Sequence, residues 1–404
     1  MITLSSVRPQ RPTPSAAIAA GAASSSPPTS AVNETISCLV RVTRANSIDR
    51  AARLATLLVA ATALAGFGSA AKPIRFTVSV SGDLLMHRPL LDRALRNGGG
   101  ERYDFTPFFD RIRPYVAGVE IALCHLETPL GPGAPSGYPI FNTPPALAKS
   151  VAESGWDGCQ TASNHSLDQG AGGIRSTVKA LDRAGLEHTG SFASKGASRK
   201  PTLIRVRPGL RLGLVAYTDA TNGLPLPAPW AVNVYNPESL DSAERRIVHD
   251  ARKARRAGAD ALIVNLHWGF ENASDPSGAQ RELARRLTDA NAVSAVVGQG
   301  PHVVQPIDRI NGKFVVFSEG NLVSNQSAAA GLPAATQDGL IALLDFVARG
   351  EQVEAVRLRY VPIWVRHDDY VVLPALGEGA VLRESYRRTV RIAGRGKGFS
   401  PVRP

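Results

Sequence analysis

From Ile74 onward the sequence alternates short apolar runs with amphipathic stretches, and this alternation limits the possible fold more than any other feature. The run at 74–83 has the length and the β-branched content of a buried strand. The stretches at 144–155, 171–185 and 242–258 repeat apolar residues at helical spacing, and each ends at a glycine. Strands that alternate with helices in this way are typical of a layered α/β domain.

The later strands are predicted to follow one another without helices between them. Apolar runs at 313–321, 339–347 and 353–365 come in direct succession. Because a parallel pair needs a long crossover connection, direct succession predicts a later sheet that is antiparallel or mixed. A helix is also expected at 108–116.

The first 71 residues have the composition of a targeting segment. Residues 1–53 are rich in Ser, Pro and Ala, which predicts a disordered tail, and they end in a basic stretch that includes Arg50 and Arg53. Residues 54–71 form an apolar run followed by small residues, the pattern of a signal peptide or an N-terminal anchor. We therefore expect an exported protein on the extracellular or cell-envelope face, either secreted or anchored by 54–71.

The net charge of +12 belongs mainly to the ends of the chain. Residues 1–71 carry +4 and residues 381–404 carry +6, which leaves only +2 for the rest. No basic stripe interleaved with aromatic residues is visible there, so no specific nucleic-acid partner is expected. We accordingly predict a domain over 72–380 and a basic C-terminal helix or tail over 381–404.

Cysteine usage does not decide the compartment. Only Cys124 and Cys159 lie in the predicted domain, and both fall within strand-like runs. Two buried thiols and a bridge between adjacent strands are both compatible with this placement.

Polar residues of metal-ligand or acid–base type stand at the ends of predicted strands. They are Asp83, Glu127, the pair Asn164 and His165, His267 and His302. In layered α/β folds ligands gather beyond the carboxyl ends of strands, so we expect these side chains to meet. Carboxylates, amide oxygens and imidazoles suit Mn, Fe, Zn or Mg.

The motifs around these residues also resemble a known family. They are SGDLLMH, HLETPL, SNHSLDQG, NLHWGFEN, GQGPHVVQPI and FSEGNLVSNQ. The region from Phe76 to Pro362 is identified by them as a member of the CapA family, which is named for poly-γ-glutamate capsule synthesis. That family is similar to the calcineurin-like metallophosphoesterase superfamily. The resemblance implies a four-layer α/β/β/α sandwich with mixed sheets and a site for one or two divalent metal ions.

The resemblance assigns roles at the matching positions. The metal ligands that it implies are Asp83, Glu127, Asn164, His267 and His302. It makes His165 the acid that protonates the leaving group or orients the substrate, with Asp168 orienting His165. Further candidates for contacts with metal or substrate are His87, Gln299, Glu271, Asn321 and Asn325.

Two positions depart from the superfamily pattern. Gln299 stands where a histidine of the G-H-x-H turn is expected, and Glu127 stands where an aspartate bridges the two ions. Amide oxygen is a poorer ligand than imidazole for Zn or Mn, so a one-metal site is an alternative to a two-metal site. His87 also has an alternative, as a surface histidine at the start of a helix.

Together these features predict an exported CapA-like protein in the biosynthesis of a capsule or cell-envelope polymer of the poly-γ-glutamate type. The expected chemistry is that of a metal-dependent hydrolase or transferase, of metallophosphoesterase type, acting on a phosphoester or an amide. The implied partners are an anionic envelope polymer or a phosphorylated substrate, and a membrane synthase complex. The alternative is a non-catalytic capsule-assembly component that binds the polymer or that complex.

Overall fold

The computed structural model describes residues 72–350 and 352–403. The tail predicted at 1–53 and the signal peptide or anchor predicted at 54–71 lie outside the described residues. Among the described helices, none is both long enough and apolar enough to cross a membrane.

The larger of two sheets has nine strands. They are β1 (Ile74–Leu84), β2 (Ile121–Leu126), β3 (Gly158–Gln160), β4 (Glu187–Thr189), β11 (Asn321–Val323), β12 (Asp338–Arg349), β13 (Gln352–Val365), β14 (Val372–Pro374) and β15 (Phe399–Pro401). β1 to β4 are parallel, whereas β12 pairs antiparallel with the other side of β1 and is followed by β13 and β14. The short strands β11 and β15 add in parallel to β1 and β13.

The smaller sheet has six strands in the order β5-β6-β7-β8-β10-β9. They are β5 (Thr202–Arg207), β6 (Leu210–Thr218), β7 (Ala261–His267), β8 (Ala295–Gln299), β9 (Ile307–Ile310) and β10 (Lys313–Val316). β6, β7, β8 and β10 are parallel, and the two edge strands are antiparallel. The prediction of one strand over 313–321 is wrong, because the chain leaves this sheet after Val316 and joins the nine-stranded sheet at Asn321.

Most of the helices cover the outer faces of the sheets. The helices are α2 (Arg88–Asn97), α3 (Arg113–Val116), α4 (Ala146–Ser154), α5 (Gly170–Ala184), α6 (Lys195–Ser198), α7 (Leu240–Arg256), α8 (Gly278–Asp289) and α9 (Ala380–Ala393), with 3₁₀ turns η1 (Thr106–Phe108), η2 (Ala328–Ala330) and η3 (Ala334–Gln337). α4 and α5 end at Gly155 and Gly185, both in the left-handed conformation that favours glycine. The helix predicted at 108–116 forms only in part: Pro114 lacks an N–H group, and α3 begins beside it.

Alternation along the central strands divides the core into layers. In β2, Ile121 and Leu123 face the core between the two sheets, whereas Ala122, Cys124 and Leu126 face the core beneath α2, α4 and α5. Successive side chains of a strand point to opposite faces, so both faces of β2 are buried and all of its residues are apolar or functional.

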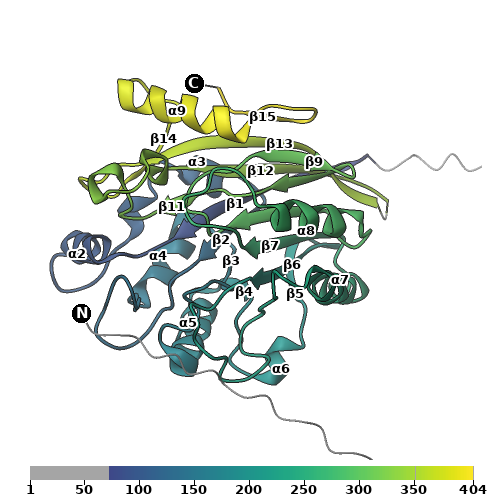
Figure 1. Ribbon diagram of the computed structural model, residues 1–404, viewed down its shortest axis with the longest axis horizontal. Coiled ribbons are helices and arrows are strands. Elements are labelled where there is room, and N and C mark those ends of the chain that lie inside the picture. The colour runs from purple at the N-terminus through teal and green to yellow at the C-terminus, as the bar shows by residue number, and fades with distance from the viewer. Residues whose placement is uncertain (1–71, 351, 404) are drawn as a thin grey trace, which may run out of the picture. The chain divides into compact units, whose positions relative to one another are not determined.

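The smaller sheet repeats this arrangement. Ile263 of β7 packs between the sheets, whereas Leu262 and Val264 pack against Ile247 of α7 and Leu283 of α8. Figure 1 shows α7 and α8 together beside β6 and β7. The predicted four-layer α/β/β/α sandwich with mixed sheets is therefore confirmed.

A disulfide joins two neighbouring strands of the larger sheet. Cys124 of β2 and Cys159 of β3 are register partners with Cα atoms 4.5 Å apart, and they are bonded to each other. Of the two arrangements that the sequence allows, the structure has the bridge.

The C-terminal segment is part of the larger sheet's packing. α9 lies along β12 and β13 (Figure 1), and β15 pairs with β13. The segment 381–404, predicted as a basic helix or tail, thus contains a helix that is docked on the domain rather than surrounded by solvent.

Candidate metal centre

The carboxyl ends of β1, β2, β7 and β8 carry the polar side chains of the site. Asp83 and His125 are register partners in the larger sheet, and His267 and Gln299 are register partners in the smaller sheet. All four side chains are buried. Because parallel neighbours end side by side, each sheet delivers a pair of functional side chains to the same place.

Asp83 belongs to two groups of potential metal ligands. One group is Asp83, His125 and His267, and the other is Asp83, Glu127 and His302. Within each group, one ligand atom of every residue lies within 4.8 Å of the others. No further group of this kind occurs among the described residues. A carboxylate common to two such groups is positioned as a ligand shared by two cations.

Several buried oxygens of this cluster have no partner. Glu127 follows β2 directly and is buried, and neither of its carboxylate oxygens accepts a hydrogen bond from any residue that the structure describes. The same is true of Asp83 Oδ1 and Asn164 Oδ1. Buried carboxylates are costly unless they are paired or coordinate a metal, so this donor set fits a divalent cation.

The pKa values of Glu127 and His302 also fit a site for a divalent cation. Burial raises the pKa of Glu127 well above its ordinary value. Burial works against a charged His302, but the carboxylates of Glu127 and Asp83 outweigh it and raise the pKa of His302 to about 10. Both shifts show that the cluster retains a proton to offset its negative charge, which is a role that a bound cation takes over.

The other two histidines are held neutral. Burial lowers the pKa of His125 to about 4. Burial, followed by the neighbouring His125, lowers the pKa of His267 well below its ordinary value. Neutral imidazole is the form that ligates metals.

His302 reaches the cluster from a turn beyond β8. Its φ of 59° is in the left-handed region, which is sparsely populated for residues other than glycine and is often found at functional sites. Its Nδ1 donates to Asp83 Oδ2 at 3.0 Å and lies 3.1 Å from Asn321 Oδ1, which leaves Nε2 toward Glu127 at 3.7 Å. Gly300 in the same turn has a φ of 105° and leaves room for the His267 ring.

The turn after β3 places Asn164 and His165 beside Glu127. Ser163 Oγ donates to the backbone oxygen of Glu127 at 2.7 Å and accepts the N–H of His165 at 3.1 Å. This link fixes the turn to the end of β2.

His165 and Asp168 form a hydrogen-bonded dyad. His165 Nδ1 donates to Asp168 Oδ2 at 2.8 Å, and the same oxygen accepts the N–H of Phe141 at 2.8 Å. The Phe141 ring packs edge-on against His165, with ring centroids 4.7 Å apart. The His165 ring is therefore oriented from two sides, and its Nε2 has no hydrogen bond to any residue that the structure describes.

Comparison with known proteins identifies the family. The sequence profile of the family described as "Bacterial capsule synthesis protein PGA_cap" matches residues 77–326. The chain belongs to this capsule synthesis family. It is 26% identical over 261 residues to the capsule biosynthesis protein CapA of Bacillus anthracis, covering 62% of this chain and 60% of that protein. It is 25% identical over 256 residues to the PGA biosynthesis protein CapA of Bacillus subtilis (strain 168), covering 62% and 63%.

A mycobacterial relative has a similar description. A probable polyglutamine synthesis accessory protein of Mycobacterium tuberculosis is 29% identical over 179 residues, which are 43% of this chain and 46% of the relative. The chain thus spans less than two thirds of the length of each of these three relatives.

Solved phosphatases resemble the fold only distantly. A phosphatase from Mycoplasma pneumoniae has a TM-score of 0.43 and 10% identity, covering 78% of this chain and 99% of its own. The calcineurin-like phosphoesterase YfkN from Bacillus subtilis has a TM-score of 0.43 and 14% identity, covering 79% and 98%. Similarity at this level does not transfer an activity or a residue's role.

One potential ligand of this family member, His125, was missed by the sequence analysis. Its Nε2 lies 3.6 Å from Asp83 Oδ1 and 2.9 Å from His267 Nδ1. The signal was present in the HLE motif, because residues two apart on a strand share a face and Glu127 was already a candidate.

Gln299, at the end of β8, is held between two other buried polar side chains. Its Oε1 accepts Gln160 Nε2 at 3.1 Å, and its Nε2 donates to Glu319 Oε2 at 2.9 Å. The Gln160 amide also contacts Nδ1 of His125. Both ends of the Gln299 amide are thus engaged by protein, and Gln299 supports His125 through Gln160.

The chain of amides ends at a buried acid that the sequence analysis also missed. Glu319 is fully buried, and burial raises its pKa well above the ordinary value. Its place in the FSEGN motif could not be linked to β8 from the sequence, because the link crosses from Gln299 to a loop between the two sheets.

Three of the remaining candidates surround the cluster as supports. His87 Nδ1 accepts the N–H of Asn325 at 3.3 Å, and its ring packs edge-on against Phe141. Asn325 Oδ1 accepts the hydroxyl of Tyr370. Asn321 contacts His302 and donates to the backbone oxygen of Thr336 at 2.9 Å. His87 belongs to neither ligand group.

Glu271 is the exposed member of the candidate set. Its charge acts on Glu127 and His302, where it is a minor cause of their raised pKa values. The structure therefore places Glu271 near the cluster, on its solvent side.

Proposed function

We propose that this chain is an exported, divalent-metal-dependent enzyme of capsular polymer synthesis that hydrolyses or transfers a phosphoester or amide bond. The observation that carries the proposal is the buried cluster in which Asp83 is shared by two groups of potential ligands. Buried carboxylate oxygens that accept no hydrogen bond reduce the stability of a fold, and a bound cation offsets that cost.

The residues that would hold the cations follow from the two groups. Asp83, His125 and His267 would hold one, and Asp83, Glu127 and His302 would hold the other. Asn164 offers a further amide oxygen. When bound, such cations polarise a phosphoryl or carbonyl oxygen and lower the pKa of water.

The chain itself supplies the proton for the leaving group. His165 Nδ1 is tied to Asp168, so Nε2 is the atom that faces a substrate. As the bond to phosphorus or to the carbonyl carbon breaks, the leaving oxygen or nitrogen keeps the electron pair and takes the proton from His165 Nε2. Water or an acceptor group forms the new bond and releases a proton, which restores His165.

We place the activity outside the cytoplasm. The signal-like pattern of 54–71 supports export. The disulfide between Cys124 and Cys159 supports it independently, because structural disulfides persist in oxidising compartments.

A non-catalytic role in capsule assembly is the second candidate. It is favoured by the description of the mycobacterial relative as an accessory protein and by Gln299, which stands in place of an expected histidine and is engaged by protein. In this role the cluster would bind metal for structure, and the domain would bind polymer or a membrane synthase complex.

Elemental analysis of the purified protein tests the proposal first. We expect near-stoichiometric Mn, Fe or Zn in the wild type and its loss in Asp83→Ala and His302→Ala. Asp182→Ala, which removes an exposed carboxylate that belongs to neither ligand group, is the control. Loaded protein is then assayed on phosphoesters and γ-glutamyl amides. Metal without turnover supports the assembly role, and absence of metal after reconstitution contradicts both the metal site and the enzyme.

A further inference from the structure

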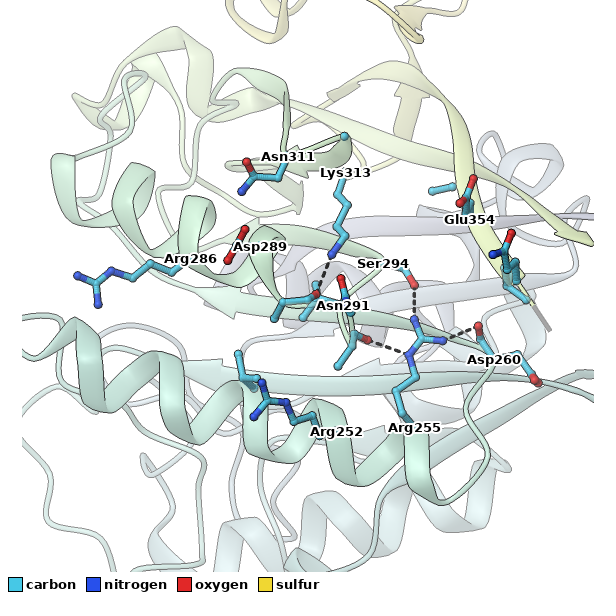
Figure 2. Close-up of a pocket in the computed structure, with 18 of the residues that line it drawn as sticks. Arg252, Arg255, Asp260, Arg286, Asp289, Asn291, Ser294, Asn311, Lys313 and Glu354 are labelled. Atoms are coloured by element: carbon cyan, nitrogen blue, oxygen red, sulfur yellow. Dashed lines mark hydrogen bonds between the residues drawn. The ribbon is translucent and has the colours of Figure 1, made fainter.

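A hollow lies at the opposite end of the smaller sheet from the metal centre. It has a volume of about 1220 Å³ and is bounded by α7, α8, the β9–β10 hairpin and the start of β13 (Figure 2). Asp260 and Ser294, which line it, immediately precede β7 and β8, whereas His267 and Gln299 end those strands. Since a strand rises about 3.3 Å per residue, the two sites are separated by roughly 20 Å.

Positive side chains outnumber negative ones in this hollow. Its lining holds five arginines and Lys313 against four carboxylates. Arg286 is already paired with Glu244 and with two acids outside the lining, Asp241 and Glu282. The other cations of the lining form no such pair: among the described residues, no carboxylate oxygen lies within 4.0 Å of their charged nitrogens. They are Arg252, Arg255, Arg256, Arg309 and Lys313. The hollow therefore carries positive charge that the protein does not neutralise.

Arg255 is the most enclosed of these cations. Its guanidinium donates to the backbone oxygens of Ala292 at 2.9 Å and Asp260, and to Ser294 Oγ at 2.8 Å. These acceptors are neutral. Burial lowers the pKa of Arg255, and the nearby Asp260 carboxylate offsets only part of this effect.

Lys313 faces the same hollow from β10. Its Nζ donates to the backbone oxygen of Ala290 at 2.7 Å, again a neutral acceptor. Burial, followed by the charge of Arg255, lowers the pKa of Lys313, and Asp289 offsets only part of this. Figure 2 shows Arg255 and Lys313 reaching toward the same space from α7 and from the strand opposite. Two half-buried cations that repel each other form a site that an anion stabilises.

We propose that this hollow binds an extended anionic polymer through its carboxylate groups. Binding of an anion follows from the uncompensated charge of Arg255 and Lys313, with Arg252 exposed on the same helix as a further contact. The volume exceeds what one phosphate or acetate fills, which favours a chain over a small ion. The choice of a carboxylate polymer rests on the proposed function in capsule synthesis, whereas the choice of an anion does not.

Fluorescence anisotropy with a labelled, short γ-linked glutamate oligomer tests the inference on the full chain. The variant pair is Arg252→Glu with Lys313→Met, in which methionine keeps most of the lysine stem. The matched control pair, Lys179→Glu with Lys149→Met, removes the same charge from a different basic hollow of 520 Å³. We expect the variant pair to weaken binding about tenfold or more and the control pair about twofold or less.

The outcomes separate this site from the metal centre. The same comparison is repeated in an Asp83→Ala background, where the variant pair should still weaken binding about tenfold or more, so failure of the proposed enzyme activity does not affect this result. Equal weakening in both pairs would reveal general charge attraction and overturn the proposal, as would unchanged binding in the variant pair. Duplex DNA binding as tightly through the same residues would overturn the assignment to carboxylates. If the variant pair melts early, Arg252→Gln with Arg256→Gln, both exposed, replaces it.

Discussion

Asp83 Oδ2 and His302 Nδ1 lie 3.0 Å apart although 219 residues separate them in the sequence. Asp83 belongs to β1 of the larger sheet, and His302 follows β8 of the smaller sheet. Their hydrogen bond closes the site across the two sheets. The cluster is buried because it lies between the two sheets, and each sheet covers the ligands of the other.

Replacing Asp83 by Asn is expected to separate metal binding from folding. In chelator-treated protein the variant should melt close to the wild-type temperature, because it removes one buried carboxylate while Glu127 remains to balance the charge of His302. With metal at about one hundred times its Kd, the free energy of unfolding of the wild type should rise by about 2.7 kcal/mol, whereas that of the variant should change little. Differential scanning calorimetry with and without chelator measures both. Asp92→Asn, in an exposed ion pair, is the control, and a wild type that metal does not stabilise contradicts the prediction.

The dyad of His165 and Asp168 is expected to act on turnover and not on metal binding. Asp168→Asn leaves an amide that cannot stabilise a charged His165, so kcat on any substrate found should fall about 10²- to 10⁴-fold. Metal content should stay at the wild-type level. Asp182→Asn makes the same change in the exposed pair with His188, 3.1 Å apart, and should leave kcat unchanged. Loss of metal in Asp168→Asn would instead show a structural role.

Gln160 is expected to affect metal affinity through His125. Gln160→Leu keeps the volume of the side chain but leaves His125 Nδ1 and Gln299 Oε1 without their partner. Removing such supports of a ligand histidine typically lowers metal affinity about 10- to 100-fold. Competition with a fluorescent chelator gives the affinity. Gln337→Leu, which removes an amide contact to a backbone oxygen elsewhere, is the matched control, and equal affinities in the two variants would refute the role of Gln160.

The sequence predicts the layers of the fold well because hydrophobic alternation is a local property. The runs around β2, β7 and β8 are mostly apolar on both faces, as expected of strands in a sheet that is buried on both sides. The prediction of one strand over 313–321 is wrong because apolar residues continue where the chain crosses from one sheet to the other. Nothing local marks Phe317 as the residue where pairing changes.

The candidate site is predictable where ligands follow strand ends and is not predictable where they depend on contacts between sheets. Asp83, Glu127 and His302 stand at recognisable turns. The position of Gln299 depends on Gln160 and Glu319, which come from other strands and loops. Its substitution for a histidine was visible in the sequence, but its hydrogen-bond partners were not.

The disulfide is expected to contribute much of the stability of the larger sheet. It closes a loop between residues 35 apart, for which chain entropy predicts about 3–4 kcal/mol. Cys124→Ala with Cys159→Ala should therefore lower the free energy of unfolding by that amount in urea titrations. Adding a reductant should bring the wild type to the same value and leave the double variant unchanged. A wild type insensitive to full reduction would contradict the contribution.

A buried ion pair holds the C-terminal helix on the larger sheet. Arg388 of α9 donates to Asp338 Oδ1 at 2.9 Å, and Ser385 Oγ donates to the same oxygen at 2.7 Å. Burial raises the pKa of Asp338 despite this pairing. The folded state therefore binds the Asp338 proton more tightly than the unfolded state, and stability falls as pH rises from the ordinary pKa of Asp338 to the raised one.

Replacing Arg388 by Met is expected to destabilise the protein most at neutral and alkaline pH. It leaves Asp338 buried without its counter-ion, which typically costs about 3–5 kcal/mol, and it raises the pKa of Asp338 further. Protonated Asp338 needs no counter-ion, so the difference from the wild type should shrink as pH falls. Urea unfolding from pH 8 to pH 4 measures this difference. Arg387→Met, on the exposed side of α9, should show little difference at any pH, and a loss in Arg388→Met that does not vary with pH would rule out Asp338 as its cause.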